Sequence, residues 1–191
     1  APPEYEARFR PEDMKLRKNV PEEAHEAARS QQAQYCAMIA NLDDNVGRIL
    51  SWLDESGETA NTLVCFFSDH GEMGGSHGRV QKGNAYDESI RIPMIMRLPD
   101  RLPSGLRVGH PANLVDLLPT CATLCGLPVP ADVQGINLSR LCSPEKDHNA
   151  SPREGSLIQF FGNPRYHPEG KVTAQWRALR TERYTLTVRD D

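Results

Sequence analysis

The residues of this chain best suited to chemistry are Asp69 and His70, which follow a short apolar run at 62–67. A short apolar and β-branched run without polar alternation is typical of a strand buried on both faces of a mainly parallel sheet. Side chains just past the carboxyl end of such a strand line the crevice where open α/β sheets bind ligands. Because Asp69 offers anionic oxygens and His70 a neutral imidazole nitrogen, we predict that both bind a metal ion.

A glycine-rich loop follows this pair and leads to Lys82. Its glycines allow sharp turns, so Lys82 can place an ammonium group beside an anionic substrate and stabilise charge developing on a sulfuryl or phosphoryl oxygen. His77 and Glu72 are predicted to support the loop by packing and local hydrogen bonds rather than to bind the metal. The alternative is an ordinary polar turn in which Asp69 is a local cap and Lys82 a surface charge.

The stretch from Phe66 to Pro99 resembles the sulfatase family of the alkaline-phosphatase-like superfamily at successive landmarks. These landmarks are the strand, the Asp-His pair, the Gly-Ser-His-Gly loop, the lysine, and the segment 86–93 that leads into a strand at 94–96. The stretches at 35–50, 115–120 and 176–181 are similar to further landmarks of the family. The resemblance therefore covers most of the chain, in the family's order.

This resemblance implies an α/β fold class. Residues 1–142 are expected to form part of an alkaline-phosphatase-like, mainly parallel sheet flanked by helices. Residues 143–191 are expected to form a linker and part of a small antiparallel C-terminal sheet.

The resemblance also implies roles for the site residues. Asp69 and His70 would coordinate the divalent cation, and Lys82 would contact the sulfate group and its bridging oxygen. Calcium is the usual metal of the family. An imidazole is a softer ligand than calcium prefers, so the pair also suits manganese or zinc.

The family's nucleophile, a formylglycine made from the first residue of a Cys-x-Pro-x-Arg motif, has no good match here. The nearest sequence, at 142–146, has lysine in place of the arginine and lies downstream of the metal loop, so we interpret it as a surface loop. Asp43 and Asp44 fall within a helical pattern and are interpreted as one polar face. We therefore expect the formylglycine in a missing N-terminal half, and the chain to be the C-terminal portion of a longer enzyme.

The leading hypothesis is a fragment of a sulfatase-like, metal-dependent hydrolase that cleaves sulfate esters of a small molecule or glycan. Phosphonate monoester or phosphodiester hydrolysis is the alternative within the superfamily. The third hypothesis is that the isolated chain is a non-catalytic module, and we expect no turnover from it alone.

Composition narrows the possible partners. The net charge of −4 and the scattered basic residues argue against nucleic acid. No apolar run approaches the roughly 20 residues that cross a membrane. The cysteine count of 5 is odd, so at least one thiol is unpaired or bonded between chains. Localisation and oligomeric state are not predicted.

Hydrophobic periodicity and structure-breaking residues predict the helices and strands that position the site. A helix should start at Val20–Glu23 and run to about Gly57, with an apolar stripe packed against the sheet. A helix at 116–125 should be capped by Val115 or Asp116. The other expected elements are a short helix at 84–89, a strand at 93–97, a linker at 143–155, and strands at 156–161, 175–181 and 184–188.

Overall fold

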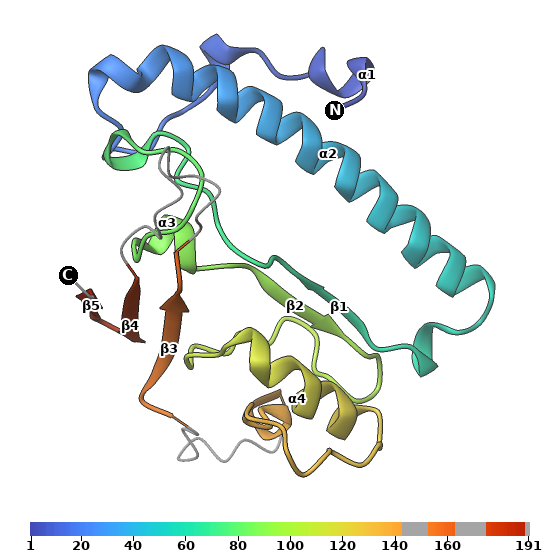
Figure 1. Cartoon of the computed structure of the whole chain (residues 1–191). Helices are drawn as coiled ribbons and strands as arrows, with labels where there is room; N and C mark the ends of the chain where they lie inside the picture. Colours follow the sequence, from blue (N-terminus) through green and yellow to red (C-terminus); the bar gives the residue numbers. More distant parts are fainter. Residues whose placement is uncertain (143–152, 163–174, 190–191) are drawn as a thin grey trace. The chain divides into compact units, whose positions relative to one another are not determined.

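The computed structural model describes residues 1–142, 153–162 and 175–189, which belong to two compact units (Figure 1). The first unit comprises residues 1–59, 70–82 and 86–91, and the second comprises 60–69, 83–85 and the chain from 92 onward. The sequence predicted a domain boundary after residue 142, and residues 143–152 directly after it lie outside the described residues. That division stays a prediction.

The first unit is built on one long helix, α2 (His25–Glu55), accompanied by the short helices α1 (Pro3–Glu6) and α3 (Asp87–Ile90). A single 3-10 turn at Glu22–Ala24 precedes α2, which confirms the predicted start. The helix ends at a left-handed Gly57, and the N–H of Glu58 donates to the carbonyl of Leu53 at 3.0 Å. Glycine takes this conformation without steric cost, so the predicted end near Gly57 is also confirmed.

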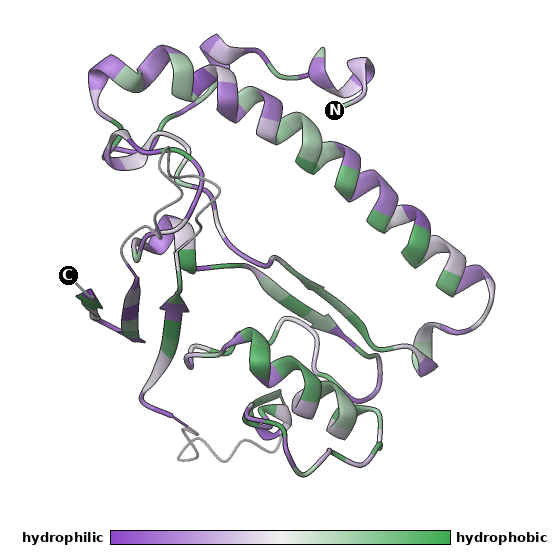
Figure 2. Ribbon diagram, viewed as in Figure 1, coloured by the Kyte–Doolittle hydropathy of each residue, from purple (hydrophilic) through white to green (hydrophobic). Residues whose placement is uncertain are grey.

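The prediction that the apolar stripe of α2 belongs to the core is wrong for most of its length. The buried residues of α2 are mainly small, whereas Ile39 and Trp52 are 51% and 61% exposed. Figure 2 shows hydrophobic residues recurring among hydrophilic ones along this helix. Periodicity identifies which residues share a helix face, but it does not show whether another element covers that face.

In the second unit, β1 (Val64–Phe67) pairs with β2 (Met94–Arg97). Both predicted strands are confirmed, but their pairing is antiparallel, with Val64 opposite Arg97. Phe67 and Ile95 are exposed, so the expected strand buried on both faces of a parallel sheet is not seen within the described residues. An apolar run predicts a strand without specifying the direction of its neighbour.

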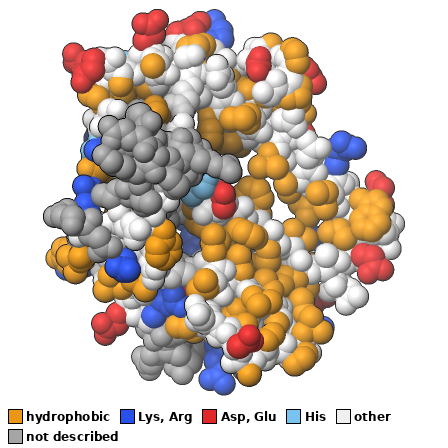
Figure 3. Space-filling model, viewed as in Figure 1, with side chains coloured by type: hydrophobic (Ala, Val, Ile, Leu, Met, Phe, Trp, Pro, Cys, Tyr) orange, Lys and Arg blue, Asp and Glu red, His pale blue; other side chains and the backbone are white. Residues whose placement is uncertain are grey.

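The three predicted C-terminal strands are confirmed as a small antiparallel sheet in the order β3 (Gly155–Phe160), β4 (Trp176–Thr181) and β5 (Thr185–Arg189). Trp176 is buried, stacks on Phe160 and donates its indole N–H to the carbonyl of Gly83 at 3.0 Å. The sheet is therefore attached to the segment that follows the glycine-rich loop. Hydrophobic side chains also lie at the surface of the protein, as Figure 3 shows. Among the described residues, no helix is both long and apolar enough to cross a membrane.

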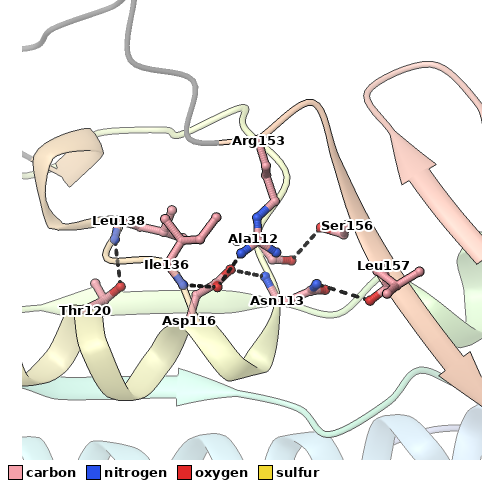
Figure 4. A network of polar contacts seen from close by, with 9 residues as sticks. All are labelled: Ala112, Asn113, Asp116, Thr120, Ile136, Leu138, Arg153, Ser156 and Leu157. Carbon is pink, nitrogen blue, oxygen red and sulfur yellow. Dashed lines mark hydrogen bonds and ion pairs between the residues drawn. The ribbon is translucent and has the colours of Figure 1, made fainter. Parts of the chain in front are cut away.

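Helix α4 (Leu117–Leu124) has Asp116 at its N-cap position, one of the two predicted caps, but the side chain of Asp116 makes no cap hydrogen bond to α4. Asn113 is the N-cap of the preceding 3-10 turn, and Asp116 completes a capping box by accepting the N–H of Asn113 at 2.7 Å. Asp116 is 1% exposed, accepts the N–H of Ile136 at 2.8 Å and pairs with Arg153 at 2.6 Å (Figure 4). The carboxylate thus joins three segments that are distant in sequence.

Neighbouring hydrogen bonds extend this network. Thr120 accepts the N–H of Leu138 at 2.9 Å, and the side-chain amide of Asn113 donates to the carbonyl of Leu157 at 3.2 Å (Figure 4). The start of α4 is therefore held to the 136–138 loop and to β3. Polar groups buried this deeply stabilise a fold only when they are hydrogen-bonded.

Replacing Asp116 with alanine should destabilise the chain by about 3–5 kcal/mol, because it removes the buried acceptor that the Arg153 guanidinium and two backbone N–H groups share. Urea denaturation measures this change. Asp132→Ala, which removes an exposed carboxylate of the same unit, is the matched control and should change the midpoint little. Equal midpoints for both variants would contradict the assigned role of Asp116.

Candidate functional site

Asp69 and His70 lie just after β1, as predicted, with Asp69 exposed and His70 half-buried. The Nδ1 atom of His70 lies 2.9 Å from the carbonyl oxygen of Gly71. A carbonyl oxygen can only accept, so Nδ1 carries the proton and the lone pair of the neutral ring is on Nε2. This tautomer is the one that metal-binding histidines adopt when a backbone carbonyl orients them.

Gly71 permits the close backbone contact that holds this turn. Its N–H donates to the carbonyl of Ser89 at 2.8 Å, and a Cβ atom on residue 71 would collide with the carbonyl oxygen of Glu88. Only glycine fits without moving that backbone. The residue after His70 is therefore fixed against α3.

Glu72 closes the glycine-rich loop. Its Oε1 atom accepts the N–H of Gln81 at 2.6 Å and the N–H of Gly74 at 3.2 Å, and it lies 3.4 Å from the side-chain amide of Gln31 in α2. The N–H of Met73 also donates to the carbonyl of Gln81 at 2.9 Å. The two ends of the loop are thus held together directly before Lys82, in agreement with the predicted hydrogen-bonding role of Glu72.

Arg17 holds the middle of the loop, and sequence reasoning did not identify it. Its guanidinium donates to the carbonyl of Met73 at 3.1 Å and to the hydroxyl of Ser76 at 3.3 Å. Met73 and Ser76 are fully buried. Arg17 lies in a polar N-terminal segment with no local motif, so no signal in the sequence distinguishes it from a surface arginine.

His77 packs within the loop although its side chain is exposed. Its ring stacks on Tyr86 at a centroid distance of 4.2 Å, and its backbone is left-handed, with φ 55° and ψ 28°. Its N–H donates to the carbonyl of Asn19 at 2.8 Å, and the Asn19 side-chain amide lies 3.1 Å from Nε2. These contacts agree with loop packing, while any role of His77 beside a metal stays a prediction.

The same Asn19 amide donates to Glu88 at 2.7 Å. Burial is the largest single influence on this carboxyl and acts to raise its pKa. Hydrogen bonds from Asn19, the Glu88 backbone and Ser76, with the His77 charge, act together in the other direction, so the pKa of Glu88 is lowered. Glu88 is therefore an acceptor that stays ionised at neutral pH and holds the Asn19 amide that lies beside His77.

Lys82 is exposed and directly follows Gln81, whose N–H is bound by Glu72. His70, Glu72 and Lys82 belong to the first compact unit. Asp69 ends the segment 60–69 of the second unit. The loop therefore presents an imidazole at its start and an ammonium group at its end.

The described residues supply only part of a metal-binding shell. Among them, no cluster of three or more His, Cys, Asp and Glu side chains is suited to hold a metal ion. Asp69 and His70 are chemically appropriate as two ligands of a divalent cation, but a hard cation takes six or more. Metal binding by this pair stays a prediction.

The two other candidate motifs have different outcomes. Asp43 and Asp44 lie exposed on α2, as expected of a polar helix face, and Asp44 accepts the hydroxyl of Tyr5 at 2.8 Å. Cys142 ends a short 3-10 helix, and burial raises the pKa of its thiol. The rest of that motif, residues 143–146, lies outside the described residues.

Comparisons with known proteins show the family of this chain. The Sulfatase family model matches residues 1–127, and the model for the C-terminal part of N-sulphoglucosamine sulphohydrolase matches residues 75–189. An ulvan-active sulfatase of Formosa agariphila is 33% identical over 192 residues, which cover 97% of this chain and 36% of that relative. The chain belongs to the sulfatase family, a family of sulfuric ester hydrolases with an alkaline-phosphatase-like fold.

Solved structures give the same result. BT4656, in complex with its substrate D-glucosamine-2-N,6-O-disulfate, matches with a TM-score of 0.72 and 27% identity, over 89% of this chain and 34% of that one. The phosphonate monoester hydrolase of Silicibacter pomeroyi matches with a TM-score of 0.76 and 26% identity, over 97% of this chain and 38% of that one. The chain thus spans a little over a third of the length of the relatives named here, and the mixed α/β fold class is confirmed.

Removing the Glu72 carboxylate should open the loop. In Glu72→Ala, we expect the amide of Gln81 to exchange with solvent at least about tenfold faster, because a hydrogen bond to a charged acceptor contributes roughly 1.5–3 kcal/mol. Residue-resolved hydrogen exchange measures this effect. Glu58→Ala, which removes an exposed carboxylate of the same unit, is the control. Unchanged protection of the Gln81 amide in Glu72→Ala would contradict the role of Glu72 in closing the loop.

Proposed function

We propose that this chain forms the metal-binding and sulfate-binding part of an enzyme that hydrolyses sulfate esters. The observation that carries the proposal is the sulfatase family match across the loop that bears Asp69, His70 and Lys82. The tautomer of His70 and the closure of the loop by Glu72 support it. The nucleophile, a formylglycine, would come from residues outside this chain.

In this proposal Lys82 is the residue that contacts the substrate. Its ammonium group binds the sulfate and stabilises negative charge on the bridging oxygen as the ester bond breaks. Glu72 fixes the backbone directly before Lys82, so the ammonium group needs less ordering when the substrate arrives. The exposure of Lys82 is compatible with an anionic ligand that binds from solvent.

Asp69 and His70 would hold the divalent cation, through a carboxylate oxygen and Nε2 respectively. When bound, such a cation polarises sulfate oxygens and orients the nucleophile. Calcium is our first choice because the sulfatase family favours it, with manganese or zinc as alternatives suited to the imidazole.

The proposed substrate is a sulfated saccharide or a sulfated small molecule. The support is that BT4656, whose structure is similar, has a disulfated glucosamine as its substrate. The second candidate function, hydrolysis of phosphonate monoesters, is supported by the structural similarity to the Silicibacter pomeroyi enzyme. Lys82 and a divalent cation would serve both reactions, because sulfate and phosphonate esters both develop negative charge on their oxygens.

The chain alone should bind calcium weakly, with a dissociation constant above about 1 mM, because two protein ligands leave a hard cation mostly hydrated. Titration followed by NMR should shift the amides of residues 69–71 in the parent chain and leave them unshifted in Asp69→Ala. Asp43→Ala, which removes an exposed helix carboxylate, should behave like the parent. Calcium shifts confined to another part of the chain would contradict the assignment of Asp69.

Substitution of Lys82 tests the catalytic proposal. In an enzyme that carries these residues together with a formylglycine segment, Lys82→Ala should lower kcat/KM for a sulfate ester about 10²–10³-fold, through loss of transition-state charge stabilisation. Arg79→Ala, which removes another exposed cation of the same loop, should have little effect. Equal losses in both variants would mean that the loop supplies only a general positive charge.

The isolated 191-residue chain should show no turnover of the same ester, because no residue in it is assigned as the nucleophile. Robust hydrolysis by the pure chain that is lost in Lys82→Ala would contradict the proposal that the nucleophile lies elsewhere.

A further inference from the structure

We propose that Cys65 and Cys121 form a dithiol site that a small disulfide, such as glutathione disulfide, oxidises to an intramolecular disulfide. The two sulfur atoms lie 3.6 Å apart, in direct contact, although the residues are 56 positions apart in the sequence. Both thiols are free and half-buried. Neither residue has a role in the proposed ester hydrolysis, so this site is independent of that function.

The contact joins two ordered elements of the same unit. Cys65 is the second residue of β1 and lies opposite Met96 of β2. Cys121 lies in the middle of α4, whose start is fixed by the buried Asp116 network. A disulfide needs the sulfurs to approach from 3.6 Å to about 2.0 Å.

Cys125 is the competing partner and lies one helical turn beyond Cys121. It is exposed, and its N–H donates to the carbonyl of Cys121 at 2.9 Å. No hydrogen bond or contact between the sulfurs of Cys121 and Cys125 is seen among the described residues, whereas the sulfur of Cys65 touches that of Cys121. The geometry therefore favours the bond between β1 and α4 over one within α4.

The reaction is a thiol–disulfide exchange in two steps. The thiolate of Cys121 attacks glutathione disulfide, forms a mixed disulfide and releases one glutathione. Cys65 then gives its proton to solvent and attacks the sulfur of Cys121, which releases the second glutathione. Two protein thiols and one glutathione disulfide thus become one protein disulfide and two glutathione molecules.

The protonation of Cys65 supports this order of steps. The pKa of the Cys65 thiol is raised to about 12. Burial is the main cause, and the hydrogen bond to Cys121 and the nearby thiols add to it. Because the thiolate is the nucleophile, attack by Cys65 is slow, and we assign it to the step that closes the disulfide. The closing step should therefore accelerate about tenfold per pH unit between pH 7 and 9, as the thiolate fraction of Cys65 rises.

Oxidation would fix the strand that leads into the candidate site. β1 ends at Phe67, and Asp69 follows two residues later. A bond from Cys65 to α4 would limit the movement of this strand in the native state. It would also restrict the unfolded chain by closing a long loop.

The test is oxidation of the native, fully reduced chain with glutathione disulfide, followed by alkylation of the remaining thiols, digestion and mass spectrometry. We expect a dominant Cys65–Cys121 peptide, unaffected in Cys125→Ser. In Cys65→Ser, glutathione should stay attached to Cys121. The thermal midpoint of the oxidised chain should rise by roughly 5–10 °C and return on reduction.

Two results would overturn the proposal. One is a dominant Cys121–Cys125 linkage in the native chain. The other is equal yields of Cys65–Cys121 peptide under native conditions and in concentrated urea, because a native contact should select this pair only in the folded chain. Since the parent chain supplies both measurements, the test does not depend on any variant folding.

Discussion

Glu72 accepts backbone N–H groups from both ends of the glycine-rich loop, and together with the Met73–Gln81 backbone bond it fixes the chain directly before Lys82. The loop is otherwise held by side chains from distant segments, Arg17 at its middle and Asn19 at His77. Its glycines supply turns and backbone hydrogen bonds but no side-chain contacts. A flexible sequence thus becomes a defined loop because charged and polar side chains satisfy its backbone.

The sequence predicted this site in outline. The apolar run placed Asp69 and His70 after a strand, and the resemblance to sulfatases gave Lys82 a role, because these features are local in sequence. The contributions of Arg17 and Asn19 were not predicted, since they come from a polar segment more than fifty residues away along the chain. Hydrogen bonds between distant segments leave no periodic or compositional signal.

In the fold, too, features that are local in sequence were predicted better than contacts between distant segments. Strands and helices with strong local patterns formed near their predicted positions, including all three C-terminal strands. Strand direction and burial were predicted less well, because both depend on neighbouring elements. The antiparallel pairing of β1 and the exposed apolar stripe of α2 are the two examples. Asp116 is the N-cap of α4, as one of the two predictions had it, but the 3-10 turn before α4 and its cap Asn113 were not predicted.

We propose that the loop from Asp69 to Lys82 serves the hydrolysis of sulfate esters. The most direct measurement compares kcat/KM for a sulfate ester and a phosphonate monoester of the same alcohol, in an enzyme that contains this chain and its nucleophile. We expect a clear preference for the sulfate ester. A strong preference for the phosphonate ester would contradict it and favour the second candidate function.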